Sequence, residues 1–355
     1  MLENAALDPP LLTADLPGIG GRIKVGPEDF EVEEIPAYEP CGSGDFLYLW
    51  IEKRGMGAEF FARQVAKRLG IGAGEVGTAG LKDRHAVTRQ WVSVPVLAEA
   101  KLTVLDGDGI RVLQVSRHTN KLRPGHLHGN RFRILVRDVD TANEANLPAL
   151  LDRLKHHGLP NFYGRQRFGR DGETLRLGLA LLRGETERKV RNPFLKKLAL
   201  SAAQSALFNH YLGQRLDDGL LRTVLAGDVM AKVPFGGMFT AEDAAREQPR
   251  FEAREIVSAG PIFGRKTFPA AGAAAEREAA VLAACQLSTA QFAGFGKLLQ
   301  GTRRHNLVYV DDLVSEKIAD GLRLSFTLPA GSYATVLLRE IMKNDLGETA
   351  DEPAE

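Results

Sequence analysis

Cysteines and long apolar runs are both scarce in this sequence. Only two of its 355 residues are cysteines, Cys41 and Cys285, and they lie far apart without the spacing of a metal site. Neither a disulfide framework nor a zinc site is therefore expected. No stretch is apolar enough to span a bilayer, and residues 1–20 lack the basic-then-apolar pattern of a secretory signal. We expect a cytoplasmic protein that is not membrane-bound.

The charge of the chain is nearly balanced overall but uneven along its length. The net charge is +1, and the fractions of 44% hydrophobic and 26% charged residues are those of an ordinary globular protein. Residues 111–137, however, include seven Arg or Lys and no Asp or Glu, whereas the segment after Lys343 is acidic. A basic stretch of this kind indicates contact with a polyanion such as nucleic acid.

The first half of the chain reads as mixed strands and helices. Its hydrophobic patterns predict strands at 21–25, 30–35, 46–51, 91–96 and 131–139, and helices at 57–69 and 143–157. Strands and helices do not alternate strictly, so the fold class expected is α+β rather than a doubly wound parallel sheet.

The pattern changes after about residue 182, and the length suits two domains. Residues 201–216 and 270–300 are helical in pattern, with Gly- and Pro-containing segments between them. Strand-like runs return at 307–310 and 322–328, and a helix follows at 334–342. This return predicts one domain built from residues 1–185 and 306–355, with residues 186–305 inserted into it.

One turn concentrates groups that can do chemistry. In GTAGLKDRHAVTRQW, residues 77–91, two glycines precede Asp83, and Lys82 and Arg84 flank it. Glycines allow a sharp turn, and the cations favour an ionised carboxylate, which can act as a nucleophile or base. The alternative is an ordinary solvated surface turn. His85 could act as a general acid, although a single histidine is more often structural.

Several blocks of the sequence together resemble one family. GTAGLKDRHAVTRQW is similar to the catalytic motif of the TruD family of tRNA pseudouridine synthases. Four further blocks resemble family motifs in the family's order: IKVGPEDFEVEEI at 23–35, NFYGRQRFG at 161–169, SAAQSALFN at 201–209 and LPAGSYATVLLRE at 328–340. One short motif would be weak support, but an ordered set over nearly the whole chain is strong.

The resemblance implies a fold and a set of site residues. It implies a pseudouridine-synthase-like catalytic domain, with a mixed or antiparallel sheet flanked by helices, and an inserted α/β domain. Asp83 falls on the catalytic aspartate, Lys24 on a basic position near it, and Asn161 on an active-site amide. Tyr163 stands where the family more often carries Phe, an aromatic that would stack on the target uracil.

The implied reaction converts a uridine of tRNA, position 13 in the D-arm, to pseudouridine. It involves neither redox chemistry nor hydrolysis, so we expect no cofactor and no metal. Asp83 would either attack the sugar or remove a ribose proton, and a base, Asp83 itself or another group, would accept the proton from carbon 5 of the uracil. The target base must leave its stack to enter a pocket.

Cations along the chain are candidates for RNA contact through phosphates. The residues predicted to bind RNA are Arg117, Lys121, Arg123, Arg131, Arg133, Arg165 and Arg167. A second cluster comprises Arg188, Lys189, Arg191, Lys196 and Lys197. The alternative is that these cations lie on exposed faces and serve solubility.

Two rival functions stay open at this point. One is an RNA-binding module on the same scaffold without catalysis. The other is a metal-dependent phosphate enzyme using Asp83 and Asp171, although carboxylates or histidines at ligand spacing are missing. tRNA is the expected partner, and no obligate protein partner is inferred. The sequence leaves the oligomeric state open.

Overall fold

The computed structural model describes residues 2–186, 190–234 and 236–344. Contacts divide the chain into two compact units. Unit 1 comprises Met1–Leu16, Arg153–Tyr309 and Thr335–Glu340, and unit 2 comprises Pro17–Asp152, Val310–Ala334 and Ile341–Glu355. The chain returns to unit 2 at residue 310, close to the expected border at 305/306. It leaves unit 2 at 152/153 rather than at 185/186, and its first sixteen residues belong to unit 1. The domain limits drawn from the sequence stay a prediction.

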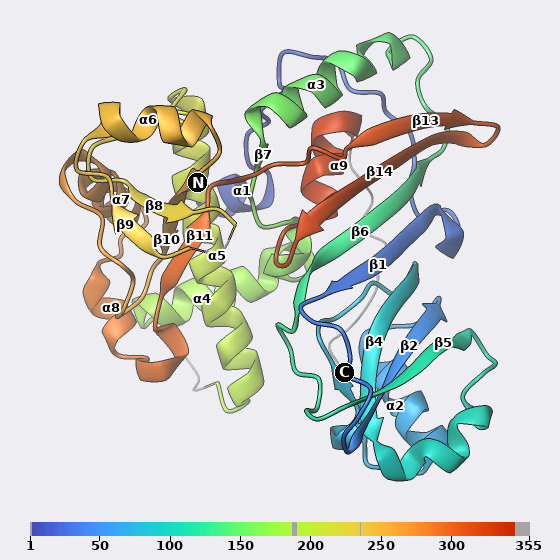
Figure 1. Ribbon diagram of the computed structural model, residues 1–355. Coiled ribbons are helices and arrows are strands. Elements are labelled where there is room, and N and C mark those ends of the chain that lie inside the picture. The colour runs from blue at the N-terminus through green and yellow to red at the C-terminus, as the bar shows by residue number, and fades with distance from the viewer. Residues whose placement is uncertain (1, 187–189, 235, 345–355) are drawn as a thin grey trace. The chain divides into compact units, whose positions relative to one another are not determined.

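Unit 2 is built on one mixed sheet (Figure 1). Its path runs β13-β14-β6-β1-β4-β2-β5, and β3 pairs with β4. The pair β1–β4 is parallel and the other described pairs in this sheet are antiparallel. The strands are β1 (Phe30–Pro36), β2 (Phe46–Arg54), β3 (Gly77–Thr78), β4 (Val87–Pro95), β5 (Ile110–His118), β6 (Leu127–Val136), β13 (Val314–Ile318) and β14 (Gly321–Pro329).

Strands from both ends of the chain share this sheet. β14 pairs with β6, and β6 pairs with β1, so the two runs at 30–35 and 322–328 belong together. The α+β class and the mixed sheet flanked by helices are confirmed.

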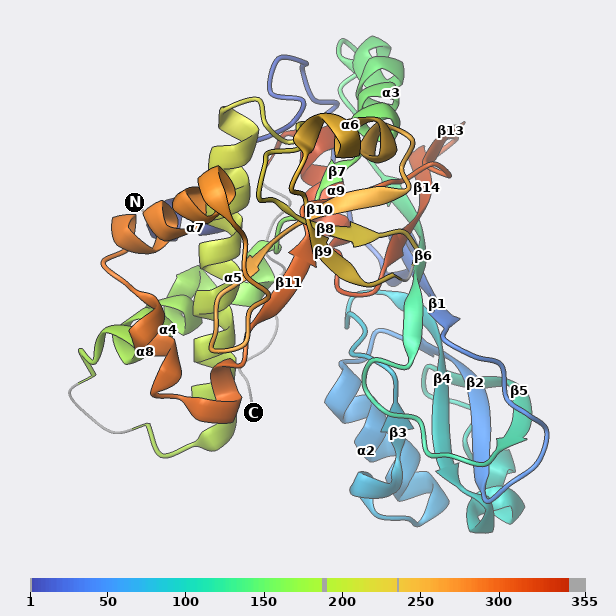
Figure 2. The same ribbon diagram turned by 60° about the vertical axis from the view of Figure 1, so that its left-hand side comes forward.

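Helix α2 (Ala58–Leu69) covers one face of the unit 2 sheet (Figure 2). Phe61 and Val65 on the helix pack with Leu49 and Ile51 of β2, and all four are fully buried. The helix ends at Gly70, whose φ of +67° is the left-handed conformation that glycine adopts without strain.

Two predictions about local structure were wrong. Residues 21–25 form no strand: Arg22 makes an isolated bridge to Arg137, and Lys24 has a φ of +57°, which breaks the extended backbone. The long helix expected at 270–300 is broken into α7 (Gly272–Ala284), α8 (Thr289–Ala293) and a 3-10 helix at Gly296–Leu299. An alanine-rich composition favours helix but does not fix where helices end.

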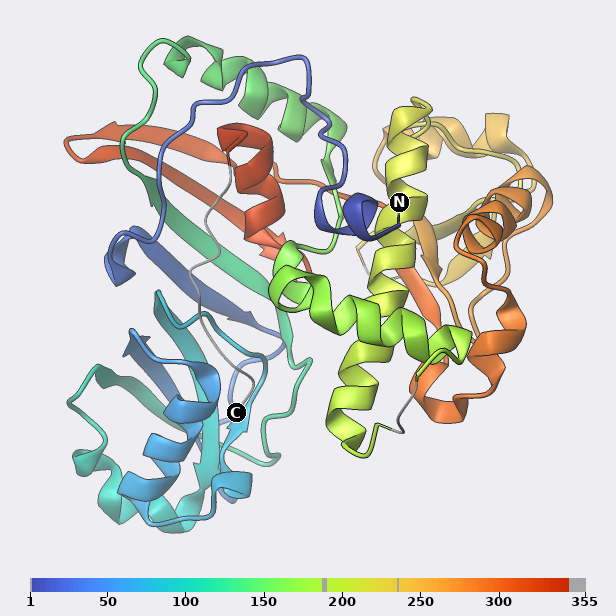
Figure 3. The same ribbon diagram turned by 180° about the vertical axis from the view of Figure 1, so that it is seen from behind.

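Unit 1 is organised around the long helix α5 (Pro193–Asp217). Asn192 caps it by accepting hydrogen bonds from the backbone N–H groups of Phe194 and Leu195. Helices α1 (Leu2–Leu7) and α4 (Glu173–Arg183) pack on α5 (Figure 3), as do α7 and strand β10 (Ile256–Ile262).

A small sheet completes unit 1. Its order is β11-β10-β8-β9, and β7 pairs with β12 separately. The helices and strands not yet named, of which α3 and α9 have residues in both units, are α3 (Leu147–His157), β7 (Leu159–Pro160), β8 (Val229–Lys232), β9 (Met238–Thr240), α6 (Ala244–Glu252), β10 (Ile256–Ile262), β11 (Thr302–His305), β12 (Leu307–Val308) and α9 (Ala334–Met342). Further 3-10 helices lie at Pro27–Asp29, Ala73–Glu75, Val96–Val104, Glu144–Asn146, Arg165–Phe168 and Arg170–Gly172.

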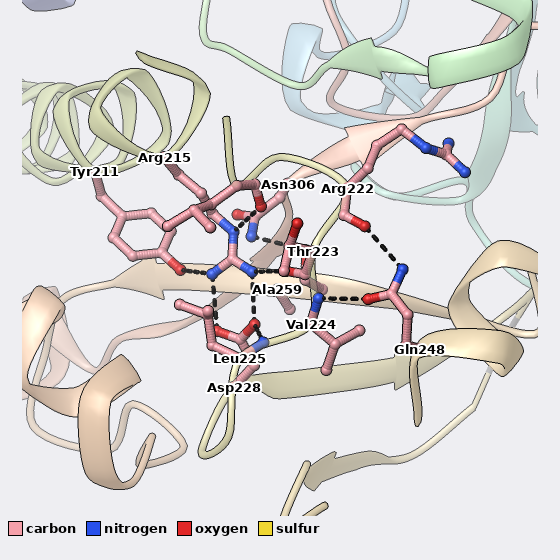
Figure 4. Close-up of polar contacts among 12 residues, drawn as sticks. Tyr211, Arg215, Arg222, Thr223, Val224, Leu225, Asp228, Gln248, Ala259 and Asn306 are labelled. Atoms are coloured by element: carbon pink, nitrogen blue, oxygen red, sulfur yellow. Dashed lines mark hydrogen bonds and ion pairs between the residues drawn. The ribbon is translucent and has the colours of Figure 1, made fainter. Parts of the chain in front are cut away.

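A buried ion pair holds α5 to the loop before β8 (Figure 4). Arg215 donates to both carboxylate oxygens of Asp228, at 2.8 and 2.6 Å, and also to the hydroxyl of Tyr211 at 3.2 Å. The side chains of Arg215 and Asp228 are 1% and 3% exposed. Burial opposes the charge of Arg215, but Tyr211 and Asp228 raise the pKa of its guanidinium above the usual value. The pair is therefore charged and structural.

Candidate functional site

Asp83 lies in the turn between β3 and β4, and buried contacts fix the backbone of this turn. Lys53 on β2 is fully buried, and its ammonium donates to the carbonyl oxygens of Asp83 at 2.9 Å and Met56 at 2.5 Å. The turn approaches its neighbours closely, since a Cβ on Gly77 would collide with the Oγ of Ser93. The backbone of Asp83 is thus anchored while its carboxylate is left to project.

The residue before Asp83 is anchored by a second buried cation. Lys82 donates to the carboxylate of Glu34 at 2.6 Å, and the two side chains are 4% and 1% exposed. Glu34 also accepts from the backbone N–H of Trp91 at 3.3 Å. The sequence reasoning missed this role of Glu34. Its alternation with Phe30 and Val32 places Glu34 on the buried face of β1, and a buried carboxylate requires a partner.

The structure brings Lys24 to the Asp83 carboxylate. The ammonium Nζ lies 3.5 Å from Oδ1, and the side chains are 13% and 38% exposed for Lys24 and Asp83. The same ammonium lies 4.4 Å from the ring centroid of the buried Phe30, a cation–π contact. Lys24 is therefore held in place by its own surroundings, and it stabilises negative charge on Asp83. His85 follows in the same turn and is half-buried.

Asn161 and Tyr163 belong to unit 1, not to the unit that carries Asp83 and Lys24. They follow β7, and buried backbone contacts hold them. The N–H of Tyr163 donates to Oδ1 of Asn209 at 2.8 Å, and Nδ2 of Asn209 donates back to the Tyr163 carbonyl at 2.9 Å. Asn209 is fully buried on α5. This reciprocal pair fixes the loop in which Tyr163 sits.

Arg304 on β11 joins Asn161 and Tyr163, and no sequence motif indicates this role. Its guanidinium donates to the Asn161 carbonyl at 2.9 Å and to Oδ1 of Asn161 at 2.7 Å. Its Cζ lies 4.1 Å from the centroid of the Tyr163 ring. We call Asn161, Tyr163 and Arg304 the Arg304 cluster. The Asn161 amide also donates to the His305 carbonyl at 3.0 Å, so its side chain serves to hold β11 and the loop together.

The predicted RNA-binding arginines of the middle motif lie beside this cluster. Arg167 donates to the hydroxyl of Ser205 at 3.1 Å and lies 5.6 Å from the Tyr163 ring centroid. Arg165 is exposed and donates to the Leu7 carbonyl at 3.0 Å.

The basic run 111–137 occupies β5, β6 and the loop between them, all in unit 2. Its arginines on β6 face acidic residues of β1: Arg131 is paired with Glu33 at 2.6 Å, and Arg133 lies opposite Glu31. Arg117 is paired with Glu99 at 2.6 Å. The acids missing from the run in sequence are therefore supplied by neighbouring elements in space.

The other cationic cluster is described only in part. Arg188, Lys189 and the acidic segment 345–355 lie outside the described residues. Lys196 on α5 lies 5.4 Å from the Phe295 ring centroid. Among the described residues, no three His, Cys, Asp or Glu side chains are grouped so that they could hold a metal ion. No helix within the described ranges is long and apolar enough to cross a membrane.

Comparison with known proteins gives consistent matches over nearly the full chain. The family model for tRNA pseudouridine synthase D (TruD) matches residues 6–192 and 189–341. A tRNA pseudouridine synthase D from Anaeromyxobacter dehalogenans (strain 2CP-C) is 47% identical over 342 residues, covering 95% of this chain and 97% of the relative. A protein of the same name from a strain of Thermus thermophilus is 44% identical over 348 residues, covering 97% and 95%.

The fold also matches a solved structure. A crystal structure from Methanosarcina mazei, described as a candidate tRNA pseudouridine synthase D (TruD), superposes with a TM-score of 0.78 at 24% identity. The match covers 97% of this chain and 98% of the other. At that identity the likeness supports the fold alone.

Proposed function

Because this chain belongs to the TruD family of tRNA pseudouridine synthases, we propose that it isomerises a uridine of tRNA to pseudouridine with Asp83 as the catalytic carboxylate. The observation that carries this proposal is the state of the Asp83 turn. Its backbone is anchored by the buried Lys53, while its carboxylate is 38% exposed beside the ammonium of Lys24. A fixed but accessible carboxylate can act directly on a substrate.

The reaction detaches the uracil from the ribose, turns it and joins it again to the same ribose carbon. The bond between ribose carbon 1′ and N1 of uracil breaks, and its electron pair leaves with the base. The uracil then rotates, and its carbon 5 forms the new bond to carbon 1′. A proton leaves carbon 5 and N1 gains one, so substrate and product are isomers.

Two roles for Asp83 fit this scheme. In the first, the carboxylate attacks carbon 1′ and forms an ester, which breaks when carbon 5 attacks the same carbon. In the second, the carboxylate takes a ribose proton as the base departs and returns it after the new bond forms. Both routes use an anionic Asp83, and the ammonium of Lys24 at 3.5 Å favours that anion.

We propose uridine 13 in the D-arm as the target, on the strength of the family resemblance. A base in a folded tRNA must be unstacked before it can react, and the unstacked base needs a surface to lie on. The Arg304 cluster offers an aromatic ring and a guanidinium held together at 4.1 Å, and both kinds of group stack on bases. We assign Tyr163 to stacking and Asn161 to holding the loop.

The deciding experiment replaces Asp83 with asparagine. Asparagine nearly matches aspartate in shape but can be neither an anionic nucleophile nor an effective base. Asp83→Asn should fold, bind tRNA and release no tritium from tRNA labelled at carbon 5 of uridine, even with enzyme in excess over tRNA. Asp45→Asn, a change at an exposed aspartate elsewhere in unit 2, is the matched control and should stay active.

The outcomes separate the proposal from its rivals. Turnover of Asp83→Asn within about tenfold of wild type, a barrier change of only ~1.4 kcal/mol, would contradict the catalytic role. A wild-type chain that binds tRNA without forming pseudouridine would be a binding module. Loss of activity on chelation would favour the metal-dependent enzyme. Mapping pseudouridine along the product tRNA tests position 13 separately.

Stacking by Tyr163 has its own test. Tyr163→Phe should keep most activity, because the ring is retained. Tyr163→Ala should lose stacking worth about 1–3 kcal/mol per base. Equal losses in the two variants would move the role from the ring to the hydroxyl.

A further inference from the structure

The cations of the run 111–137 do not share one environment in unit 2. Arg131 on β6 and Arg137 just after it are tied to acids. Arg137 donates to both oxygens of Asp29, at 3.0 and 2.8 Å, and these hydrogen bonds lower the pKa of that carboxyl. Arg131 is paired with Glu33. These positive charges are largely neutralised within the sheet, so they attract a polyanion less than the sequence suggests.

The loop between β5 and β6 is different. Lys121, Arg123 and His126, together with Phe46, Thr119 and Asn120, line a solvent-open cavity of about 370 Å³. Lys121 donates to the Gly74 carbonyl, which leaves its charge uncompensated, and Arg123 is exposed. Among the residues that the structure describes, no carboxylate lies within ion-pair distance of Lys121 or Arg123. We call this cavity the β5–β6 groove.

The groove is fixed by a hydrogen-bonded aromatic cluster. The Tyr38 hydroxyl lies 2.7 Å from Nδ1 of His126, and the Tyr48 hydroxyl donates to the Asn120 carbonyl at 2.9 Å. Between these two bonds the loop is pinned again, because the N–H of the buried Leu122 donates to the Oγ of Ser93 at 2.9 Å. A loop held at three points does not need to be ordered when a ligand arrives.

The composition of the groove favours a particular ligand. Phe46 and the His126 imidazole supply ring surfaces, and Lys121 and Arg123 supply positive charge within the same cavity. A volume of about 370 Å³ lies within the range of roughly 300–1,000 Å³ that is typical of small-ligand sites, and a single nucleotide suits it. Aromatic surfaces beside cations are how proteins hold single-stranded RNA.

We propose that the β5–β6 groove binds one unstacked nucleotide of the RNA substrate, with its base against Phe46 and His126 and its phosphate at Lys121 and Arg123. This inference rests on the proposed function, since it assumes that tRNA is the substrate. It also divides the basic run: Lys121 and Arg123 contact RNA, whereas Arg131 serves the sheet.

The test compares two arginines of the same run by the salt dependence of tRNA binding. Each lost phosphate contact lowers the slope of log affinity against log salt by about 0.7–0.9. Arg123→Ala should lower the slope by about one unit, whereas Arg131→Gln, the acid-paired control, should leave it unchanged. Arg123 is an exposed loop residue, so its replacement should not disturb folding.

A second variant examines the base. Phe46→Leu keeps an apolar side chain and removes the ring. It should weaken binding about five- to a hundredfold, as the loss of one stacked base does, and leave the salt slope unchanged. Circular dichroism of the variant confirms that the sheet is intact.

The outcomes distinguish this inference from the proposed function. An unchanged slope in Arg123→Ala, or an equal drop in Arg131→Gln, would overturn the groove as a nucleotide site while wild-type tRNA binding and turnover stand. A wild-type chain that neither binds nor modifies tRNA would overturn the proposed function and this inference with it. A slope lowered by Arg123→Ala alone, with weaker binding in Phe46→Leu, supports the groove.

Discussion

Two ion pairs in this protein differ in how far their carboxylates are buried and hydrogen-bonded. In Arg215–Asp228, the guanidinium binds both carboxylate oxygens and the N–H of Leu225 donates to one of them at 2.8 Å, with both side chains almost fully buried. In Lys24–Asp83, one ammonium lies 3.5 Å from one oxygen and the carboxylate is 38% exposed. Within the described part of the chain, no donor makes a hydrogen bond to the Asp83 carboxylate.

The difference lies in which part of the residue the surrounding cations hold. Around Asp228 they hold the carboxylate itself, so its lone pairs are used inside the fold. Around Asp83 the buried cations hold other groups: Lys53 binds the Asp83 carbonyl, and Lys82 binds Glu34. The turn is thereby fixed without using the oxygens that would react. A satisfied carboxylate stabilises the fold, whereas a fixed and unsatisfied one is available for chemistry.

Removing the buried carboxylate of Asp228 should have the largest effect on stability. Asp228→Ala leaves the guanidinium of Arg215 buried without its counter-ion, and breaking a buried pair in this way costs about 3–5 kcal/mol. Urea denaturation of the full chain measures this loss. Asp218→Ala is the matched control, because Asp218 pairs with Arg277 at the surface and should cost less than about 1 kcal/mol. Equal losses in the two variants would contradict the contrast between buried and exposed pairs.

Breaking the Lys24–Asp83 pair should change activity more than stability. Lys24→Gln takes away the ammonium that positions Asp83, and we expect kcat to fall roughly ten- to a hundredfold, a barrier change of about 1.4–2.8 kcal/mol. The urea midpoint should change less, since the contacts described for the Lys24 ammonium are one loose ion pair and a cation–π contact with Phe30. Lys24→Arg keeps a cation and should recover part of kcat. If Lys24→Arg were as slow as Lys24→Gln, charge would not be the reason for the loss.

Acid should weaken unit 1 through its half-buried histidines. Burial, and then the charge of the neighbouring Arg304, lower the pKa of His305 below its ordinary value of 6.5. As the pH falls, His305 is therefore protonated in the unfolded chain before it is protonated in the folded chain. The neutral, folded His305 contributes fully to the free energy of unfolding above pH 6.5, and this contribution is lost as the pH falls towards the folded pKa. Burial likewise lowers the pKa of the half-buried His210.

The measurement is the urea midpoint between about pH 7.5 and 5.5, a range around the ordinary pKa of histidine. The wild-type midpoint should fall over this range, and His305→Gln should reduce the fall. His128→Gln, at an exposed position, is the control. A His305→Gln profile parallel to that of wild type would show that the His305 imidazole contributes nothing to acid sensitivity.

The sequence predicted those elements whose pattern is local. The helix at 334–342 and the strand at 322–328 are found as α9 (Ala334–Met342) and β14 (Gly321–Pro329), because apolar residues recur at the helical or strand period. Strand β5 was missed: most of its residues are exposed and it lies at the sheet edge, so it lacks alternation. The strand at 21–25 failed at Lys24, whose positive φ no periodicity reveals.

The residues of the candidate site also divide into those that a local motif predicts and those that only the fold brings together. Asp83 and Lys24 could be named because their motifs are short and specific. Arg304 could not, because its partners Asn161 and Tyr163 are about 140 residues away in sequence, and only the fold joins them. The acid partners of the run 111–137 could not be found for a related reason: Glu33, which pairs with Arg131, lies 98 residues earlier. Charge counted along a chain omits what neighbouring strands supply.

Breaking the exposed pair Arg131–Glu33 should have the smallest effect on stability. It tests the comparison with the buried pair Arg215–Asp228 from the exposed side. The two side chains are 49% and 32% exposed, and the nitrogen–oxygen distance is 2.6 Å. Good geometry at an exposed site contributes little, because water screens the charges and ordering two long side chains costs entropy. A double-mutant cycle with Arg131→Gln and Glu33→Gln should give a coupling energy of about 0.2–1 kcal/mol, falling as salt is raised. A coupling above about 2 kcal/mol, approaching the cost of breaking a buried pair, would mean that burial is not what separates Arg215–Asp228 from the other ion pairs of this fold. A coupling near zero would mean that Glu33 does not neutralise Arg131. Arg131 would then again be a candidate for contact with an RNA phosphate.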